Sequence, residues 1–95
     1  MKKIRIDKVF RVDSNEEVDF KKGLLLIDDK AIQSNWTVSL SDVKDPGSFQ
    51  AEDSSYHLRL TDRMGHTYVG TAGTDLISND GSVLMVSKGD LTEEA

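Results

Sequence analysis

The stretch YHLRLTDRMGHTYVGTA, residues 56–72, decides the fold because it reads as a β-hairpin. Apolar residues at every second position up to Leu60 predict a strand with one buried face. The four residues from Asp62 to Gly65 predict a tight turn, in which Gly65 takes a positive φ at little steric cost. In this register three pairs face each other: Asp62 with His66, Leu60 with Tyr68, and Leu58 with Gly70.

The buried face of this hairpin has a gap at Gly70, which offers no side chain beside Leu58. A large side chain from another strand can cover such a gap. We expect Trp36, the single tryptophan, to cover it. The predicted face consists of Tyr56, Leu58, Leu60, Tyr68, Gly70 and Ala72.

Period-2 alternation recurs on both sides of the hairpin and predicts further strands. These strands cover residues 3–13, 18–20, 24–27, 31–33, 35–43 and 82–87. In the first of them Val9 falls on the opposite parity from Ile4 and Phe10, which predicts a bulge near residues 7–9. Residues 44–54 and 70–75 read as connections, because the first contains the only proline and the second is rich in small residues.

Regularly spaced short strands without a helix-period segment predict an all-β fold. We expect a small single-domain barrel or sandwich of about seven or eight short antiparallel strands, and the pattern leaves barrel and sandwich open. Residues 1–91 are expected to form the single β-domain. The polar residues 92–95 are expected to be a disordered tail.

The charge balance favours a soluble acidic protein. The chain of 95 residues has 17 acidic and 12 basic residues, a net charge of −5, and no cysteine. No basic patch is visible, and the negative charge opposes binding to nucleic acid. A disulfide framework or thiolate site is excluded, and no apolar run is long enough for membrane insertion. We therefore expect a cytoplasmic protein.

Two apolar features leave alternatives open. Residues 24–27, LLLI, either cross the centre of the fold with both faces covered or contribute an apolar surface for a partner, and we favour the first. Phe49, the one large apolar residue of the connection 44–54, either pins this loop onto the core or is a contact, and pinning is favoured.

Part of the chain resembles bacterial pleckstrin-homology and GRAM-type domains. The resemblance rests on residues 17–32, EVDFKKGLLLIDDKAI, and 38–43, VSLSDV, where a glycine precedes an apolar strand and an Asp-Lys turn leads into the next strand. It implies a small β-barrel. The C-terminal helix of that family is replaced here by a predicted strand at residues 83–86, so no lipid activity is carried over.

The side chains that could carry chemistry are sparse. His57 and His66, the only histidines, are predicted too far apart on the hairpin to bind one metal ion. No nucleophile motif is present, and residues 70–74, GTAGT, lack the lysine of a phosphate-binding loop. We therefore expect no catalytic, cofactor-binding or metal-binding residue, and a protein that is not an enzyme.

The sequence favours a non-enzymatic protein-interaction domain. Contact is expected through an exposed strand edge or through the 44–54 loop, with Phe49, Trp36 and Tyr68 as the candidate partner-binding residues. The expected partner is another protein or a second copy of the chain. The alternative is a small-ligand or surface-binding barrel with its site near Gly70 to Asp75.

Overall fold

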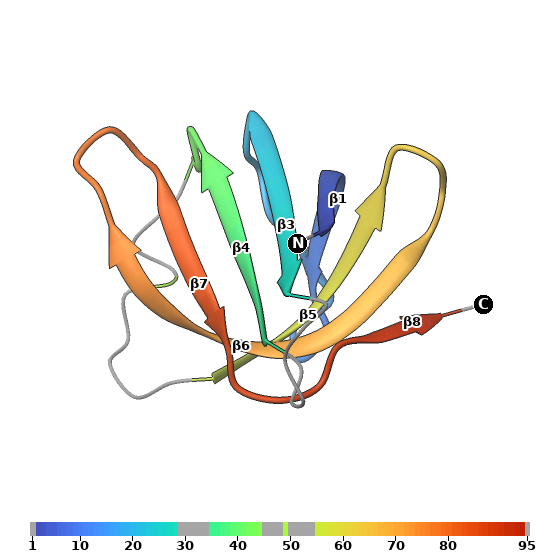
Figure 1. Cartoon of the computed structure of the whole chain (residues 1–95). Helices are drawn as coiled ribbons and strands as arrows, with labels where there is room; N and C mark the ends of the chain where they lie inside the picture. The colour runs from blue at the N-terminus through green and yellow to red at the C-terminus, as the bar shows by residue number, and fades with distance from the viewer. Residues whose placement is uncertain (1, 29–34, 45–48, 50–54, 95) are drawn as a thin grey trace.

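The computed structural model describes residues 2–28, 35–44, 49 and 55–94, and its regular elements are all β-strands (Figure 1). The strands are β1 (Lys2–Arg11), β2 (Glu16–Glu17), β3 (Lys22–Asp28), β4 (Asn35–Ser41), β5 (Ser55–Asp62), β6 (Thr67–Ile77), β7 (Val83–Ser87) and β8 (Thr92–Glu94). None of the described segments is a helix of the length and apolarity that crossing a membrane requires.

Six of the strands form a closed antiparallel barrel. Their order is β1-β3-β4-β7-β6-β5, and β5 returns to pair with β1, from Ile6 opposite Asp62 to Arg11 opposite Leu58. The two short strands are additions, because β2 pairs with β1 and β8 pairs with β6. The predicted all-β fold is confirmed, and closure decides between the two architectures in favour of a barrel.

The long strand β6 connects the two sides of the barrel. Its first part, up to Gly73, pairs with β5, and its last part, from Ala72 to Ile77, pairs with β7. Figure 1 shows β6 as a strongly curved ribbon that sweeps along the base of the view between these neighbours. A strand that changes partner along its length lets a small sheet close on itself.

The predicted hairpin is present with the predicted register. Leu58 lies opposite Gly70 and Leu60 opposite Tyr68. The Asp62 amide donates a hydrogen bond of 2.9 Å to the His66 carbonyl. Gly65 has a φ of +90°, as the turn geometry requires.

Trp36 covers the gap at Gly70, as predicted. A Cβ atom on residue 70 would lie 2.7 Å from Cζ2 of Trp36 and 3.0 Å from Cδ1 of Leu91. Trp36 is only 1% exposed, and its indole Nε1 donates a hydrogen bond of 2.9 Å to the Gly89 carbonyl. Glycine at position 70 is therefore required by the close approach of the indole ring.

The bulge predicted in the first strand is also present. The pairing of β1 with β5 shifts register between Ile6 and Lys8. Beyond this shift the alternation is inverted, so that Val9 is fully buried whereas Val12 is 41% exposed. The apolar parity of the first half of β1 therefore does not continue into the second half.

The predicted connection at residues 70–75 is wrong, because β6 continues to Ile77. The small residues of this segment accommodate close packing instead of a loop: the Lys88 side chain lies over Gly73, where a Cβ atom would be 2.6 Å from Lys88 Cε. A register shift between Thr74 and Leu76 then lets the strand continue beside β7.

The prediction of a disordered tail at residues 92–95 also differs from the structure, since Thr92–Glu94 forms β8. Leu91 packs against the core and places the next residues along β6, with Val69 opposite Thr92. The predicted strand at residues 18–20 is also wrong, because the segment beside β1 is Glu16–Glu17 instead. The predicted strand at 31–33 lies outside the described residues.

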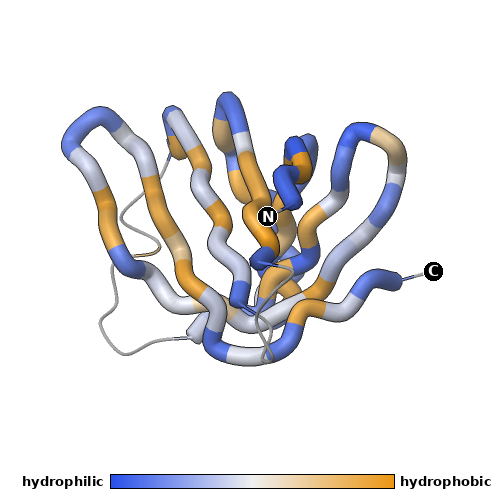
Figure 2. The backbone as a smooth tube through the Cα atoms, in the orientation of Figure 1, coloured by the Kyte–Doolittle hydropathy of each residue, from blue (hydrophilic) through white to orange (hydrophobic). Residues whose placement is uncertain are grey.

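The core lies inside the barrel and includes Trp36. Its largest fully buried members are Trp36, Phe49, Leu25, Leu40, Leu58, Leu60, Met85, Val9, Val38 and Val83. Figure 2 shows orange predominating along β3 and β7, while β4 between them alternates with paler residues.

Substitution Gly70→Ala should destabilise the barrel by about 1–3 kcal/mol, because the new methyl group collides with the buried indole ring. The measurement is urea unfolding followed by the fluorescence of Trp36. The matched control is Gly89→Ala, where nothing lies within 4 Å of the added Cβ atom. Equal stability of the two variants would contradict the packing role of Gly70.

Candidate functional site

The three predicted partner-binding residues lie in the core. The exposed fraction is 0% for Phe49, 1% for Trp36 and 6% for Tyr68. A buried side chain offers little area to a partner, so a contact surface on this barrel must consist of other residues.

Phe49 pins its loop to the barrel. The Arg11 guanidinium carbon lies 4.4 Å from the centre of the Phe49 ring, and Tyr56 packs edge-on with a centroid distance of 5.4 Å. The Thr74 hydroxyl donates a hydrogen bond of 2.6 Å to the Phe49 carbonyl. The rest of the predicted loop contact, at residues 45–48 and 50–54, lies outside the described residues.

Barrel closure leaves few strand edges for a partner. Within the described ranges, β8 pairs only with β6, and β2 pairs only with β1. The free side of β8 extends over three residues, two of which are Glu93 and Glu94. Charged residues on a short edge strand protect it against pairing with another chain.

A more extended surface is formed by aliphatic side chains on the outside of the barrel. Leu24 and Leu26 of β3 alternate with the fully buried Leu25, so they point outward and are half-buried. On β7, Leu84 and Val86 alternate in the same way with Val83 and Met85. This observation favours the second alternative for residues 24–27, an apolar surface.

Strand register brings these side chains into one surface. Leu24 and Leu84 both pair with Ser39 of β4, and Leu84 pairs on its other side with Leu76 of β6. Leu76 is 56% exposed. We call Leu24, Leu26, Leu76, Leu84 and Val86 the outer aliphatic patch.

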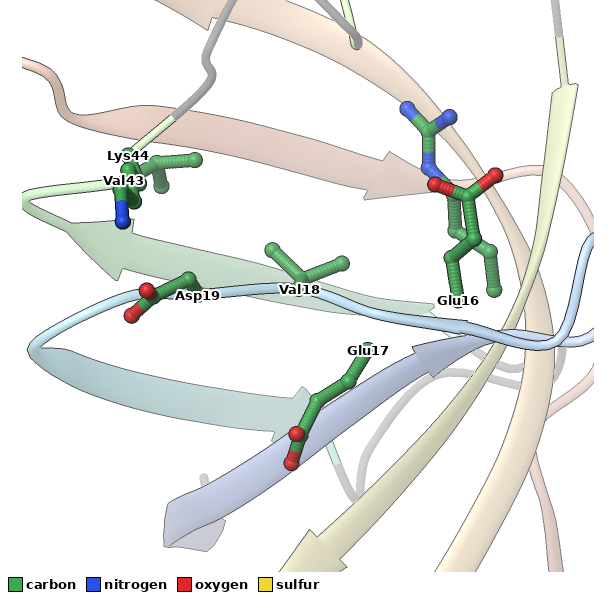
Figure 3. A pocket seen from close by; sticks show the side chains of 7 residues that line it. Glu16, Glu17, Val18, Asp19, Val43 and Lys44 are labelled. Carbon is green, nitrogen blue, oxygen red and sulfur yellow. The ribbon is translucent and has the colours of Figure 1, made fainter.

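One cavity of about 160 Å³ has a lining of mixed charge. It is lined by Arg11, Glu16, Glu17, Val18, Asp19, Val43 and Lys44. In Figure 3 Asp19 lies near Val43 and Lys44 at one end, Val18 in the middle and Glu16 at the other end, while Glu17 points away. With carboxylates and cations interspersed, this lining favours no single sign of ligand.

A second cavity of about 230 Å³ is lined mainly by cations. Its lining residues are Arg5, Ile6, Asp7, Lys21, Lys22, Gly23 and Arg63, and we call it the basic cavity. The expectation that this acidic chain has no basic patch is therefore wrong. The four cations come from three separate parts of the sequence, which is why no cluster is visible there.

A third cavity, of about 410 Å³, has an acidic lining. It is lined by Asp7, Glu17, Val18, Asp19 and Phe20. No group of three potential ligands in the described part of the chain could hold a metal ion. Residues 70–75, the predicted alternative ligand site, contribute to none of these three cavities.

Arg63 of the basic cavity is held by the hairpin turn. Asp62 accepts hydrogen bonds from the amides of Met64 at 2.9 Å and His66 at 2.8 Å, and its other oxygen lies 3.1 Å from Nδ1 of His66. Arg63 is therefore the first residue of a turn that is held closed by hydrogen bonds to the Asp62 carboxylate.

The same hydrogen bonds lower the pKa of the Asp62 carboxyl group. Burial raises its pKa, but the hydrogen bonds from the His66 and Met64 amides, together with the His66 side chain, outweigh burial and hold the pKa below the ordinary value of 3.8. On the same inward face of the hairpin, burial raises the pKa of Tyr68, and the charges of Glu93 and Asp62 add to this effect.

Within the part of the chain that the structure describes, His57 belongs to no cluster of potential metal ligands. It lies opposite Thr71, and its Nδ1 is 2.8 Å from the Thr71 hydroxyl. An exposed histidine with one hydroxyl neighbour is typical of a strand surface.

The fold defines this chain as a small closed antiparallel β-barrel with two added strands. No model of a known protein family matches it, and neither does any curated protein or solved structure.

Substitution Phe49→Ala should lower the free energy of unfolding by about 3–5 kcal/mol, since it empties a fully buried site. Urea unfolding measures this loss, with Met64→Ala as the exposed control, because Met64 is 81% exposed. A loss below about 1 kcal/mol would indicate that Phe49 is available as a loop contact.

Substitution Asp62→Asn should lower the free energy of unfolding at neutral pH. It should also make the free energy of unfolding less dependent on pH in the acid range. A carboxyl group whose pKa is lowered by folding stabilises the protein above its unfolded pKa, and this contribution is lost as the pH falls through the folded pKa. Unfolding measured between pH 2 and pH 7 tests this, with the exposed Asp75→Asn as control. Parallel pH profiles for wild type and Asp62→Asn would refute the role of the carboxylate.

Proposed function

We propose that this chain is a non-enzymatic protein-interaction domain and that the outer aliphatic patch is its contact surface. The observation that carries this proposal is the alternation along β3 and β7. In a barrel with a filled interior, outward positions normally carry polar side chains, yet the two central outward positions of β3 carry leucine and those of β7 carry leucine and valine.

The patch has the composition expected of a binding surface. Half-buried aliphatic side chains on β3 and β7 are joined by the more exposed Leu76, and the hydroxyl residues Thr37 and Ser39 lie between the two strands. Burial of apolar area at such a surface supplies the affinity, while the hydroxyl groups can form hydrogen bonds with the partner.

The chemistry of the partner follows from the charges beside the patch. Lys3 pairs with Leu26 and Arg5 with Leu24, so two exposed cations border the aliphatic side chains on β1. A partner with an apolar surface bordered by carboxylates complements this arrangement. The net charge of −5 opposes association of two copies, so we propose a different protein as the partner.

The other two predicted modes of partner binding, through a strand edge and through the 44–54 loop, have less support. Strand addition would use the free side of β8, which is short and acidic. Binding through the 44–54 loop would lack its main contact residue, because Phe49 is buried. We retain the cytoplasm as the expected compartment, and the resemblance to pleckstrin-homology domains as a prediction about the barrel alone.

The test is binding of the purified partner to patch variants. The partner is first identified by quantitative capture on the tagged chain from a lysate of the source organism, and then purified for calorimetry. Leu76→Ser should weaken binding about tenfold or more with little effect on melting, since Leu76 is 56% exposed. Lys3→Glu should weaken binding further at low salt.

The matched control is Met64→Ser, which removes another exposed apolar side chain in the turn before β6, at the opposite end of that strand from Leu76. The proposal fails if Leu76→Ser and Met64→Ser bind equally well, or if binding is lost only when proline is placed in β8. It also fails if the sole association is of the chain with itself, measured by sedimentation.

A further inference from the structure

The basic cavity brings together four cations on a chain with an excess of acidic residues. Arg5, Lys21, Lys22 and Arg63 line it together with one carboxylate, Asp7. Four positive charges and one negative charge leave a formal charge of +3 around a volume of about 230 Å³. A bound anion would neutralise part of this positive charge.

The described ion pairs leave these cations available. They join Arg59 to Glu94 at 3.7 Å and His66 to Asp62 at 3.1 Å, and neither pair includes a cation of the basic cavity. All four side chains belong to exposed residues, so their charged ends are accessible from solvent.

The backbone beneath the cations is held by the barrel. Arg5 lies opposite Leu24 in the β1–β3 pair, and Lys22 lies opposite Ser41 in the β3–β4 pair. The Lys21 amide donates a hydrogen bond of 2.8 Å to the Ser41 carbonyl. Three of the four cations are therefore attached to paired or hydrogen-bonded backbone, so little backbone entropy is lost when a ligand binds to them.

The fourth cation is held by the hairpin turn. Ile6 of β1 pairs with Asp62 at the end of β5, and Arg63 follows directly in the turn closed by the Asp62 carboxylate. This pairing is part of the contact between β1 and β5 that closes the barrel. The hairpin therefore adds its arginine to the cations of β1 and β3.

We propose that the basic cavity binds the phosphate group of a small soluble molecule, with a diphosphate as the best fit. Two guanidinium groups can each donate paired hydrogen bonds to phosphate oxygens, and two ammonium groups neutralise further charge. A phosphate carries about −1.5 to −2 charges, so a diphosphate matches the formal charge of the site better than a single carboxylate does.

The size of the cavity agrees with this class of ligand. Sites for whole drug-sized molecules usually exceed about 300 Å³. A volume of about 230 Å³ holds a phosphate or diphosphate group, while the rest of the molecule extends into solvent. This site is separate from the outer aliphatic patch, although Arg5 borders both.

The experiment is calorimetric titration of the full chain with inorganic pyrophosphate at constant ionic strength. Arg63→Gln and Lys22→Gln should each weaken binding about tenfold, as expected for loss of a charge-assisted hydrogen bond. Asp7→Asn should tighten binding, because it removes the one carboxylate of the lining. Melting curves of all variants show whether the fold is retained.

The matched control is Lys88→Gln, which removes the same charge from the exposed Lys88 over Gly73, outside the cavity. An equal loss of affinity with this control, or an absence of pyrophosphate binding by the wild type, would overturn the proposal. Vesicles containing phosphatidylserine form a separate arm. Binding to these vesicles without binding to pyrophosphate would also overturn it, since the source of the anion would then be a lipid surface.

Discussion

The barrel depends on the close approach of the Trp36 indole to the backbone at Gly70. This contact joins β4 to β6 across the interior, and the hydrogen bond from the indole to Gly89 extends it to the segment that follows β7. Leu91 packs over the same glycine, so the chain beyond β7 is held at the point where β6 has no neighbour from β7. The absence of a side chain at Gly70 thus positions β4, β6 and the segment after β7 relative to one another.

Much of this arrangement could be predicted from local patterns. Alternation and the turn at Gly65 were sufficient for the β5–β6 register, and the gap at Gly70 was sufficient to identify Trp36. The two segments that were not predicted as strands, the end of β6 and β8, depend on non-local contacts. The continuation of β6 beyond Ala72 is stabilised by pairing with β7, and β8 is positioned by Leu91. Gly73 and Asp75 of β6, and Glu93 and Glu94 of β8, are of residue types that are depleted in strands, so local propensity did not predict either segment.

The candidate sites were harder to predict than the fold. The aliphatic patch follows from residues 24–27 only when the parity of β3 is known, because Leu25 is buried while Leu24 and Leu26 face outward. The basic cavity unites Arg5, Lys22 and Arg63, which meet only because β1 pairs with both β3 and β5. Asp7 lines this cavity and also the acidic one, so opposite charges are segregated on its two sides.

The pairing of β1 with β5 also has a consequence for the order in which the chain acquires its structure. The β3–β4 and β5–β6 pairs join neighbouring strands, whereas closure unites the first strand with a segment about half the chain away. The entropy of this large loop must be lost before the contact can form. Such non-local topologies fold slowly, on the scale of milliseconds to seconds. During synthesis β1 can pair with β3 early, but its second edge remains unsatisfied until β5 has left the ribosome.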